Sequence, residues 1–204
     1  MTQRNTLLKI LWKRYKNLWV KNLDMDNYIK CYENAVTNEF CNNTITKFES
    51  SYTEHEDWPK DKPFFTQINL QKSGMWNSEI SYLKDIFEKY IKIYKKECEV
   101  DNNQWPSSFG LEPFRIKRYL PDGQNFPPHV DVNTKNNCSR FLAFFLYLTN
   151  NKEGSTIFTK HNVSSSCAKG SLLIFPPNWI YIHSGEKCVE TNKYIVGSYA
   201  HYIK

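Results

Sequence analysis

The feature that most constrains the fold is a change in the spacing of apolar residues near residue 110. Downstream of it, short apolar runs alternate with turn residues such as Pro121-Asp122-Gly123 and Pro176-Pro177. The apolar runs occupy residues 114–120, 140–149, 155–158, 171–175 and 193–203. Short strands in succession, with no long helical pattern between them, are typical of an antiparallel sandwich or barrel. We therefore expect the second half of the chain to form a β domain.

Upstream of residue 110 the apolar residues follow a helical spacing instead. The pattern predicts an amphipathic helix within residues 1–23, a short helix that begins near Thr37, and a long helix from Asn77 to about Glu99. The basic face of the first helix could meet a membrane or a nucleic acid, but a solvated face is the simpler interpretation. We predict one α+β domain over 1–204, in which a mainly helical part (1–109) packs on the β part (110–204).

The composition excludes several classes of protein. Of the 204 residues, 40% are hydrophobic and 24% charged, which argues against disorder, and the formal net charge of +6 is only mildly basic. The six cysteines include no C-x-x-C pair, so we expect free thiols in a reducing compartment. Charges interrupt the N-terminal segment too often for a signal peptide or a membrane span. A cytoplasmic protein is the expectation.

The motif His129-Val130-Asp131 carries the first chemical information. Residues two apart in an extended chain project from one face, so this imidazole and this carboxylate point the same way. Alone, the motif also fits a surface turn in which Asp131 merely orients His129. Two later residues favour a site: His183 can return to the motif if the strands fold back, and Lys193 opens the last apolar strand. An ammonium group that points into a barrel needs a carboxylate or a path to solvent.

Two imidazoles and one carboxylate form the facial triad that suits non-haem Fe(II) and leaves coordination positions open. A structural zinc site would use four ligands, commonly cysteines, and no cysteine here has that spacing.

Strand parity is compatible with a site inside a barrel. Residues 193, 195, 197 and 199 share one face of the last strand, residues 141, 143, 145 and 147 share one face of another, and both faces would have to look inward. By the same rule Arg115, Lys117 and Tyr119 project together. This brings Arg115 and Lys117 to the mouth of the site unless a bend or bulge in the strand turns them outward. Both interpretations remain open.

The second half resembles the Fe(II)- and 2-oxoglutarate-dependent dioxygenases, and among them the prolyl 4-hydroxylase-like group. The matching features lie in order between Phe114 and His201: Arg118–Gly123, His129-Val130-Asp131, Arg140, Tyr147–Thr149, Gly154–Phe158, Lys169–Phe175, His183-Ser184-Gly185, Lys193 and Tyr199. The sequence departs from the usual pattern at Phe126, where many relatives have Tyr, and at Ser155, where a second Gly is common.

The resemblance implies a double-stranded β-helix (a jelly-roll, cupin-like core) with supporting N-terminal helices. It implies that the iron ligands are His129, Asp131 and His183. Lys193 corresponds to the basic residue that pairs with the distal carboxylate of 2-oxoglutarate. The residues that flank this cosubstrate or line its pocket would be Tyr119, Tyr147, Thr156 and Tyr199.

The implied function is hydroxylation of a C–H bond, first of all in a prolyl residue of a peptide or protein, with release of succinate and CO2. Fe(II), 2-oxoglutarate and O2 are the implied cofactor and cosubstrates, with ascorbate as a candidate reductant. The same chemistry on a free amino acid, another small molecule or an alkylated nucleic acid is the alternative. Nucleic acid is disfavoured, because no arginine-rich cluster surrounds His183 and six excess charges are few.

A second alternative is a non-catalytic cupin-like barrel that binds a metal or a ligand. Lys193 and the paired tyrosines, Tyr119 and Tyr147, argue against it, since such a barrel has no need of a cation that holds a carboxylate. No oligomeric state follows from the sequence.

Overall fold

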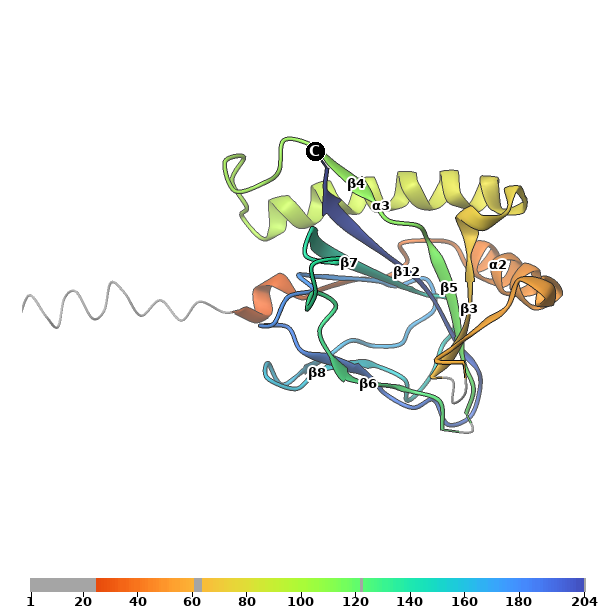
Figure 1. Ribbon diagram of the computed structural model, residues 1–204. Helices are drawn as coiled ribbons and strands as arrows, with labels where there is room; N and C mark the ends of the chain where they lie inside the picture. Colours follow the sequence, from red (N-terminus) through yellow and green to blue (C-terminus); the bar gives the residue numbers. More distant parts are fainter. Residues whose placement is uncertain (1–24, 61–63, 122, 204) are drawn as a thin grey trace, which may run out of the picture.

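The computed structural model describes residues 25–60, 64–121 and 123–203 (Figure 1). Two antiparallel sheets lie on opposite sides of an apolar interior, and two longer helices cover the outer face of the larger sheet (Figure 1). The molecule is therefore α+β, as the sequence predicts. The amphipathic helix predicted within 1–23 lies outside the described residues.

The larger sheet has eight strands in the order β1-β10-β7-β12-β5-β3-β2, with β4 paired to β12. Its strands are β1 (Lys30–Tyr32), β2 (Glu56–Trp58), β3 (Phe65–Asn69), β4 (Phe109–Leu111), β5 (Arg115–Tyr119), β7 (Arg140–Tyr147), β10 (Leu172–Phe175) and β12 (Lys193–Tyr202). The smaller sheet has the order β6-β11-β8-β9. It consists of β6 (Phe126–His129), β8 (Thr156–Phe158), β9 (Val163–Ser164) and β11 (His183–Gly185). All five predicted apolar runs contain a strand.

Of the three helices predicted upstream of residue 110, the second and third are present as α2 (Asn38–Ser50) and α3 (Asn77–Glu97). The Thr37 hydroxyl accepts a hydrogen bond from the Phe40 backbone N–H at 3.1 Å, which satisfies a free donor at the start of α2. In α3 the buried face follows the helical spacing, and the Phe87 ring stacks on Phe144 of β7 with centroids 4.9 Å apart. Short 3-10 helices are η1 (Met25–Tyr28), η2 (Tyr52–Glu54), η3 (Leu70–Lys72) and η4 (Gly74–Trp76).

The alternation of side chains along the large sheet separates two apolar clusters. The outer cluster joins the helices to Leu142, Phe144, Leu146, Ile174 and Val196, and the inner cluster, between the sheets, contains Ala143, Phe145, Tyr147, Leu173 and Ile195. The predicted inward face is thus confirmed for residues 143, 145, 147 and 195. It is wrong for Phe141, which packs in the outer cluster against Trp105 and Phe109. A register shift at Ala200/His201 in the β7–β12 ladder explains the reversal, because one extra residue changes the face of all that follow.

The part before residue 110 also contributes strands, which the sequence pattern did not predict. Strands β1, β2 and β3 join both ends of the larger sheet, so this part completes the sheet as well as covering it. Strands of three to five residues are too short to show a clear two-residue period. Among the described residues, no helix is long and apolar enough to cross a membrane.

Candidate metal centre

The two candidate histidine ligands lie on neighbouring strands of the smaller sheet. His129 ends β6, His183 begins β11, and the two residues are direct partners in the antiparallel ladder. Their ring centroids are 4.4 Å apart. Asp131, two residues after His129, brings its Oδ1 to 3.4 Å from His129 Nε2 and its Oδ2 to 3.5 Å from His183 Nε2. The structure therefore gathers all three predicted ligands at one point, with one ligand atom from each within 4.8 Å of the others.

The backbone fixes which nitrogen of each histidine faces this point. His129 Nδ1 lies 2.8 Å from the Pro127 carbonyl oxygen, and His183 Nδ1 lies 3.0 Å from that of Tyr181. A carbonyl oxygen only accepts, so each Nδ1 carries the proton and donates, and each Nε2 keeps its lone pair. Both Nε2 atoms and Asp131 Oδ2 are buried without a hydrogen-bond partner among the described residues. Three acceptor atoms that converge in this way leave room for a cation.

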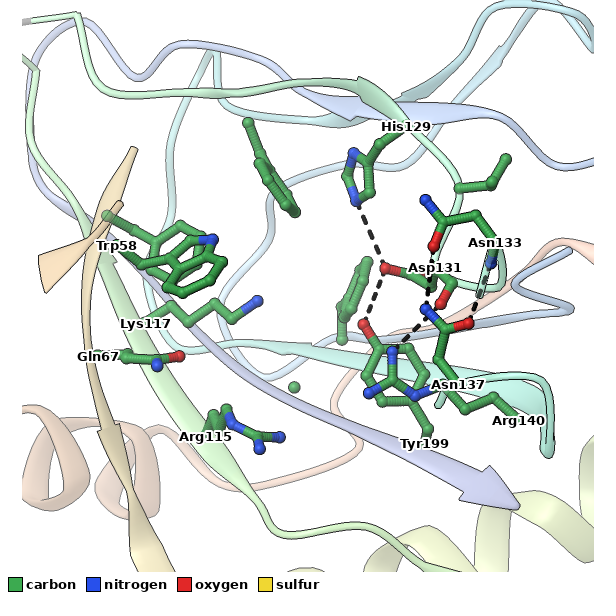
Figure 2. A pocket seen from close by; sticks show the side chains of 15 residues that line it. Trp58, Gln67, Arg115, Lys117, His129, Asp131, Asn133, Asn137, Arg140 and Tyr199 are labelled. Atoms are coloured by element: carbon green, nitrogen blue, oxygen red, sulfur yellow. Dashed lines mark hydrogen bonds and ion pairs between the residues drawn. The ribbon is translucent and has the colours of Figure 1, made fainter. Parts of the chain in front are cut away.

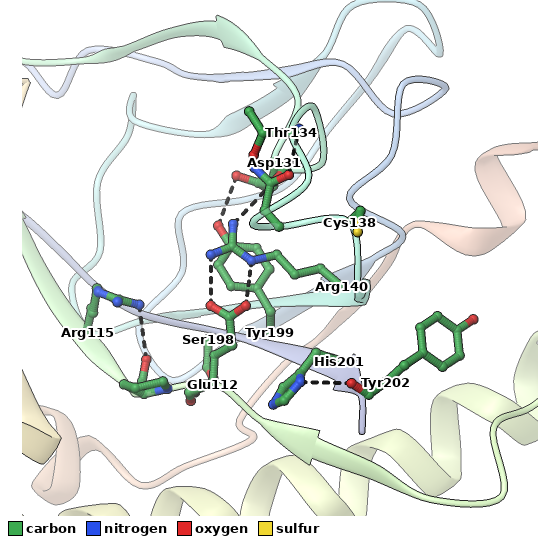
Figure 3. A network of polar contacts seen from close by, with 12 residues as sticks. Glu112, Arg115, Asp131, Thr134, Cys138, Arg140, Ser198, Tyr199, His201 and Tyr202 are labelled. Atoms are coloured by element: carbon green, nitrogen blue, oxygen red, sulfur yellow. Dashed lines mark hydrogen bonds and ion pairs between the residues drawn. The ribbon is translucent and has the colours of Figure 1, made fainter. Parts of the chain in front are cut away.

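A network of polar contacts holds the carboxylate of Asp131 in place (Figure 3). Tyr199 donates a hydrogen bond from its hydroxyl to Asp131 Oδ1 at 2.9 Å. Arg140 donates to the backbone carbonyl oxygen of Asp131 and lies over the Tyr199 ring, 3.9 Å from its centroid. Glu112 receives two hydrogen bonds from the Arg140 guanidinium, at 2.7 and 2.8 Å. The contact from Tyr199 engages one oxygen of Asp131 and leaves the other, Oδ2, for a ligand bond.

The electrostatics of the three groups suit metal binding. Burial acts to raise the pKa of Asp131, but His129, His183 and Tyr199 outweigh it and hold that pKa below its ordinary value. Burial lowers the pKa of His183, whose side chain is 2% exposed, which favours the neutral imidazole. A carboxylate and neutral imidazoles are the protonation states that bind a metal ion.

Lys193 is buried beside this centre. It opens β12 opposite Tyr119 of β5, and only 2% of it is exposed. Its ammonium nitrogen lies 5.2 Å from the ring centroid of Tyr119 and 5.8 Å from that of Tyr147, and burial lowers its pKa. A methyl group added at Gly185, two residues after His183, would be 3.8 Å from this nitrogen. Within the described part of the chain Lys193 forms no ion pair, so this buried ammonium lacks a counter-charge there.

The remaining predicted residues surround the same space, with one difference. A small cavity is lined by Tyr119, Thr156, Tyr199, Lys193 and the three candidate ligands, but not by Tyr147. The Tyr147 hydroxyl lies behind the cavity, 2.7 Å from Thr156 Oγ1 and 2.6 Å from Ser165 Oγ. Ser165 also accepts a hydrogen bond from the Thr156 backbone N–H. Sequence reasoning missed Ser165 because it lies in a polar stretch beyond the matched residues around Thr156.

A larger cavity of about 560 Å³ opens from the candidate ligands towards solvent (Figure 2). Arg115, Lys117, Trp58, Gln67 and Arg140 line it together with His129 and Asp131. Arg115 and Lys117 therefore project into the site, which decides between the two interpretations that the sequence left open. Burial is the main cause that lowers the pKa of Lys117, to about 8.

The donor set fits the ion that the resemblance implies. Two imidazole nitrogens and one carboxylate oxygen, each a buried atom with no hydrogen-bond partner among the described residues, match the facial arrangement of non-haem Fe(II) proteins. The described cysteines are free thiols, none of which belongs to this cluster.

Comparisons with known proteins agree with this donor set. Residues 114–201 match the family model of the 2OG-Fe(II) oxygenase superfamily. These 88 of the 204 residues, less than half of the chain, include the three candidate ligands and Lys193, and the match supports a 2-oxoglutarate-dependent dioxygenase that uses Fe(II). A search of the curated proteins gave no match.

Several solved structures share the fold. The viral collagen prolyl hydroxylase of Paramecium Bursaria Chlorella virus-1, in complex with 2OG, is similar at a TM-score of 0.67 and 14% identity, over 87% of this chain and 97% of that one. A Trichoplax adhaerens prolyl hydroxylase in complex with a hypoxia inducible factor peptide has a TM-score of 0.67 and 13% identity, over 93% and 92%. A Pseudomonas putida prolyl-4-hydroxylase has a TM-score of 0.59 and 11% identity, over 87% and 94%. At these identities the likeness shows a common fold.

Proposed function

We propose that this chain hydroxylates a C–H bond of a prolyl residue in a peptide or protein, with release of succinate and CO2. The observation that carries the proposal is the pairing of two features in one small space. Three orphaned ligand atoms converge from His129, Asp131 and His183, and the unpaired ammonium of Lys193 lies beside Gly185. A metal site alone would not need that buried cation, whereas a diacid that binds a metal with one end needs a cation at the other.

In this proposal each residue has a defined role. His129, Asp131 and His183 hold Fe(II), which supplies the activation of O2 when 2-oxoglutarate is bound. Lys193 pairs with the distal carboxylate of the diacid, and Tyr119 and Thr156 line its sides. Tyr147 supports Thr156 from behind through their 2.7 Å hydrogen bond. Tyr199 orients Asp131, and ascorbate is the proposed reductant.

The choice of a prolyl substrate rests on the fold relatives, all three of which are named as prolyl hydroxylases, one of them in complex with a peptide. The open cavity next to the ligands can admit such a chain. We further propose that the two sheets form a double-stranded β-helix and that 1–204 is a single domain, since the strands before residue 110 complete the larger sheet.

The test is anaerobic reconstitution with Fe(II) and 2-oxoglutarate, followed by admission of O2. We expect a weak visible charge-transfer band from the metal-bound diacid, then succinate formation that a proline-containing peptide stimulates. His129→Ala should lose the band and the bound iron. Lys84→Met, which removes an exposed cation on α3, is the matched control and should keep both. Wild-type protein that binds Fe(II) but gives no band and no succinate would refute the proposal.

A further inference from the structure

Two cations of β5, Arg115 and Lys117, line the larger cavity. The guanidinium of Arg115 donates a hydrogen bond to the Pro113 carbonyl oxygen at 3.4 Å, and the ammonium of Lys117 lies over the rings of Phe65 and Phe126, 4.5 and 5.6 Å from their centroids. Within the part of the chain that the structure describes, neither cation forms an ion pair. Both point into the cavity, as Figure 2 shows.

Neighbouring cations differ in this respect. Arg140, on the other side of the cavity, is neutralised by two hydrogen bonds to Glu112. Arg118, on the opposite face of β5, pairs with Glu49 at 2.9 Å. These two neighbouring arginines are therefore matched by acid, whereas Arg115 and Lys117 form no ion pair with a described residue where a ligand would enter.

The metal and the cosubstrate do not remove this excess. Fe(II) carries two positive charges, Asp131 one negative, 2-oxoglutarate two negative and Lys193 one positive, so the loaded centre is neutral. Of the residues described as lining the larger cavity, Asp131 and no other is acidic. The two charges of Arg115 and Lys117 therefore still lack counter-charge after loading, and their desolvation favours a further anion.

The cavity has room for that anion next to both cations. Gly197 of β12 is the direct partner of Arg115 in the ladder and lines the cavity without a side chain. Trp58, 55% exposed, and Gln67 add an apolar surface and a neutral hydrogen-bonding group. These groups suit a peptide segment better than a bare inorganic ion.

We propose that Arg115 and Lys117 select a substrate that carries a carboxylate close to the residue to be hydroxylated, and specifically an acidic peptide segment. This inference rests on the proposed function, because it concerns the substrate of the same site. The two side chains act as specificity determinants: both line the larger cavity, which Lys193 does not reach, and Lys117 also lines the smaller cavity beside Lys193.

The experiment compares pairs of short peptides that contain one proline and differ only by Asp or Asn within two residues of it. Binding is measured anaerobically to the protein loaded with Fe(II) and 2-oxoglutarate, and again to the metal-free protein. We expect the Asp peptide to bind at least tenfold more tightly, equivalent to about 1.4 kcal/mol, and the preference to weaken as salt is added. Proline against prolinamide forms a second arm, which tests whether a free acid supplies the carboxylate instead.

Variants assign the preference to the two cations. Lys117→Met and Arg115→Met should each reduce the Asp/Asn ratio to about threefold or less, and Lys117→Arg should retain it. Arg118→Met removes the same charge from the other face of β5 and should leave the ratio unchanged. Circular dichroism checks that each variant folds.

Three results would overturn the inference: equal binding of Asp and Asn peptides together with equal binding of proline and prolinamide, a preference that survives in the Lys117/Arg115 double variant, or tighter binding of a short single-stranded oligonucleotide than of any acidic peptide. The charge-transfer band, recorded before peptide is added, tests the proposed function separately. A normal band with no carboxylate preference contradicts only the inference, whereas a missing band contradicts the proposed function.

Discussion

Replacement of Lys193 by Met should raise the folding stability of the ligand-free protein and lower its affinity for 2-oxoglutarate. The substitution keeps most of the apolar stem and removes an ammonium that is 2% exposed and forms no ion pair with a described residue. Relief of an unpaired buried charge should stabilise the ligand-free protein by on the order of 1–3 kcal/mol. The same change removes the proposed charge-assisted contact to 2-oxoglutarate, worth about 1.5–3 kcal/mol, and should weaken binding of the diacid roughly ten- to hundredfold.

The pH dependence of the gain in stability has a defined sign. Burial lowers the pKa of Lys193 in the folded state, whereas the unfolded chain keeps the ordinary value. As pH rises towards that ordinary value, the unfolded state holds more protons than the folded state, so the wild-type protein gains stability. The advantage of Lys193→Met should therefore be largest near neutral pH and should shrink in alkaline solution.

The assay is urea unfolding of the metal-free proteins at several pH values, together with titration of 2-oxoglutarate into the Fe(II) form by its charge-transfer band. Lys84→Met, the exposed control, should change neither quantity by more than a few tenths of a kcal/mol. Wild-type affinity for 2-oxoglutarate in Lys193→Met would refute the assigned role. Loss of iron together with the diacid would show instead that Lys193 supports the metal centre itself.

Three further predictions follow from the polar contacts around the site. Tyr199→Phe removes the 2.9 Å hydrogen bond to Asp131 and should lower iron affinity about tenfold, measured by competition with a chelator; unchanged affinity would contradict the orienting role. Ser165→Ala leaves a buried backbone N–H and the Tyr147 hydroxyl short of a partner and should cost about 1–3 kcal/mol in urea unfolding, with no loss expected if water replaces the serine. The metal-free protein should gain stability between pH 8 and the ordinary lysine value because of Lys117, by about 3 kcal/mol at most, and Lys117→Met should lose this rise.

The local spacing of residues made much of the site predictable. His129 and Asp131 are two apart in an extended segment, so their shared direction follows from strand geometry. The inward face of β12 also follows from parity, because Lys193 and Ile195 alternate with outward residues. These arguments need no knowledge of the rest of the fold.

Contacts between distant segments could not be predicted in the same way. The partnership of Glu112 with Arg140 and that of Ser165 with Tyr147 depend on which strands lie side by side. Phe141 faces outward because of one extra residue in the β7–β12 ladder, and apolar periodicity carries no information about such a shift. Strands β1 to β3 were missed because each has five residues or fewer.

The three candidate metal ligands belong to the smaller sheet or the residues directly after β6, whereas Lys193 and Tyr119 belong to the larger one. An ion held by His129 and His183 would act as a cross-link between β6 and β11, and a diacid that reaches from that ion to Lys193 would bridge the two sheets. Loading should therefore slow amide hydrogen exchange in two stages, first in the smaller sheet and then at the start of β12. The order in which amide exchange slows in the two sheets would therefore report the order in which the ion and the diacid bind.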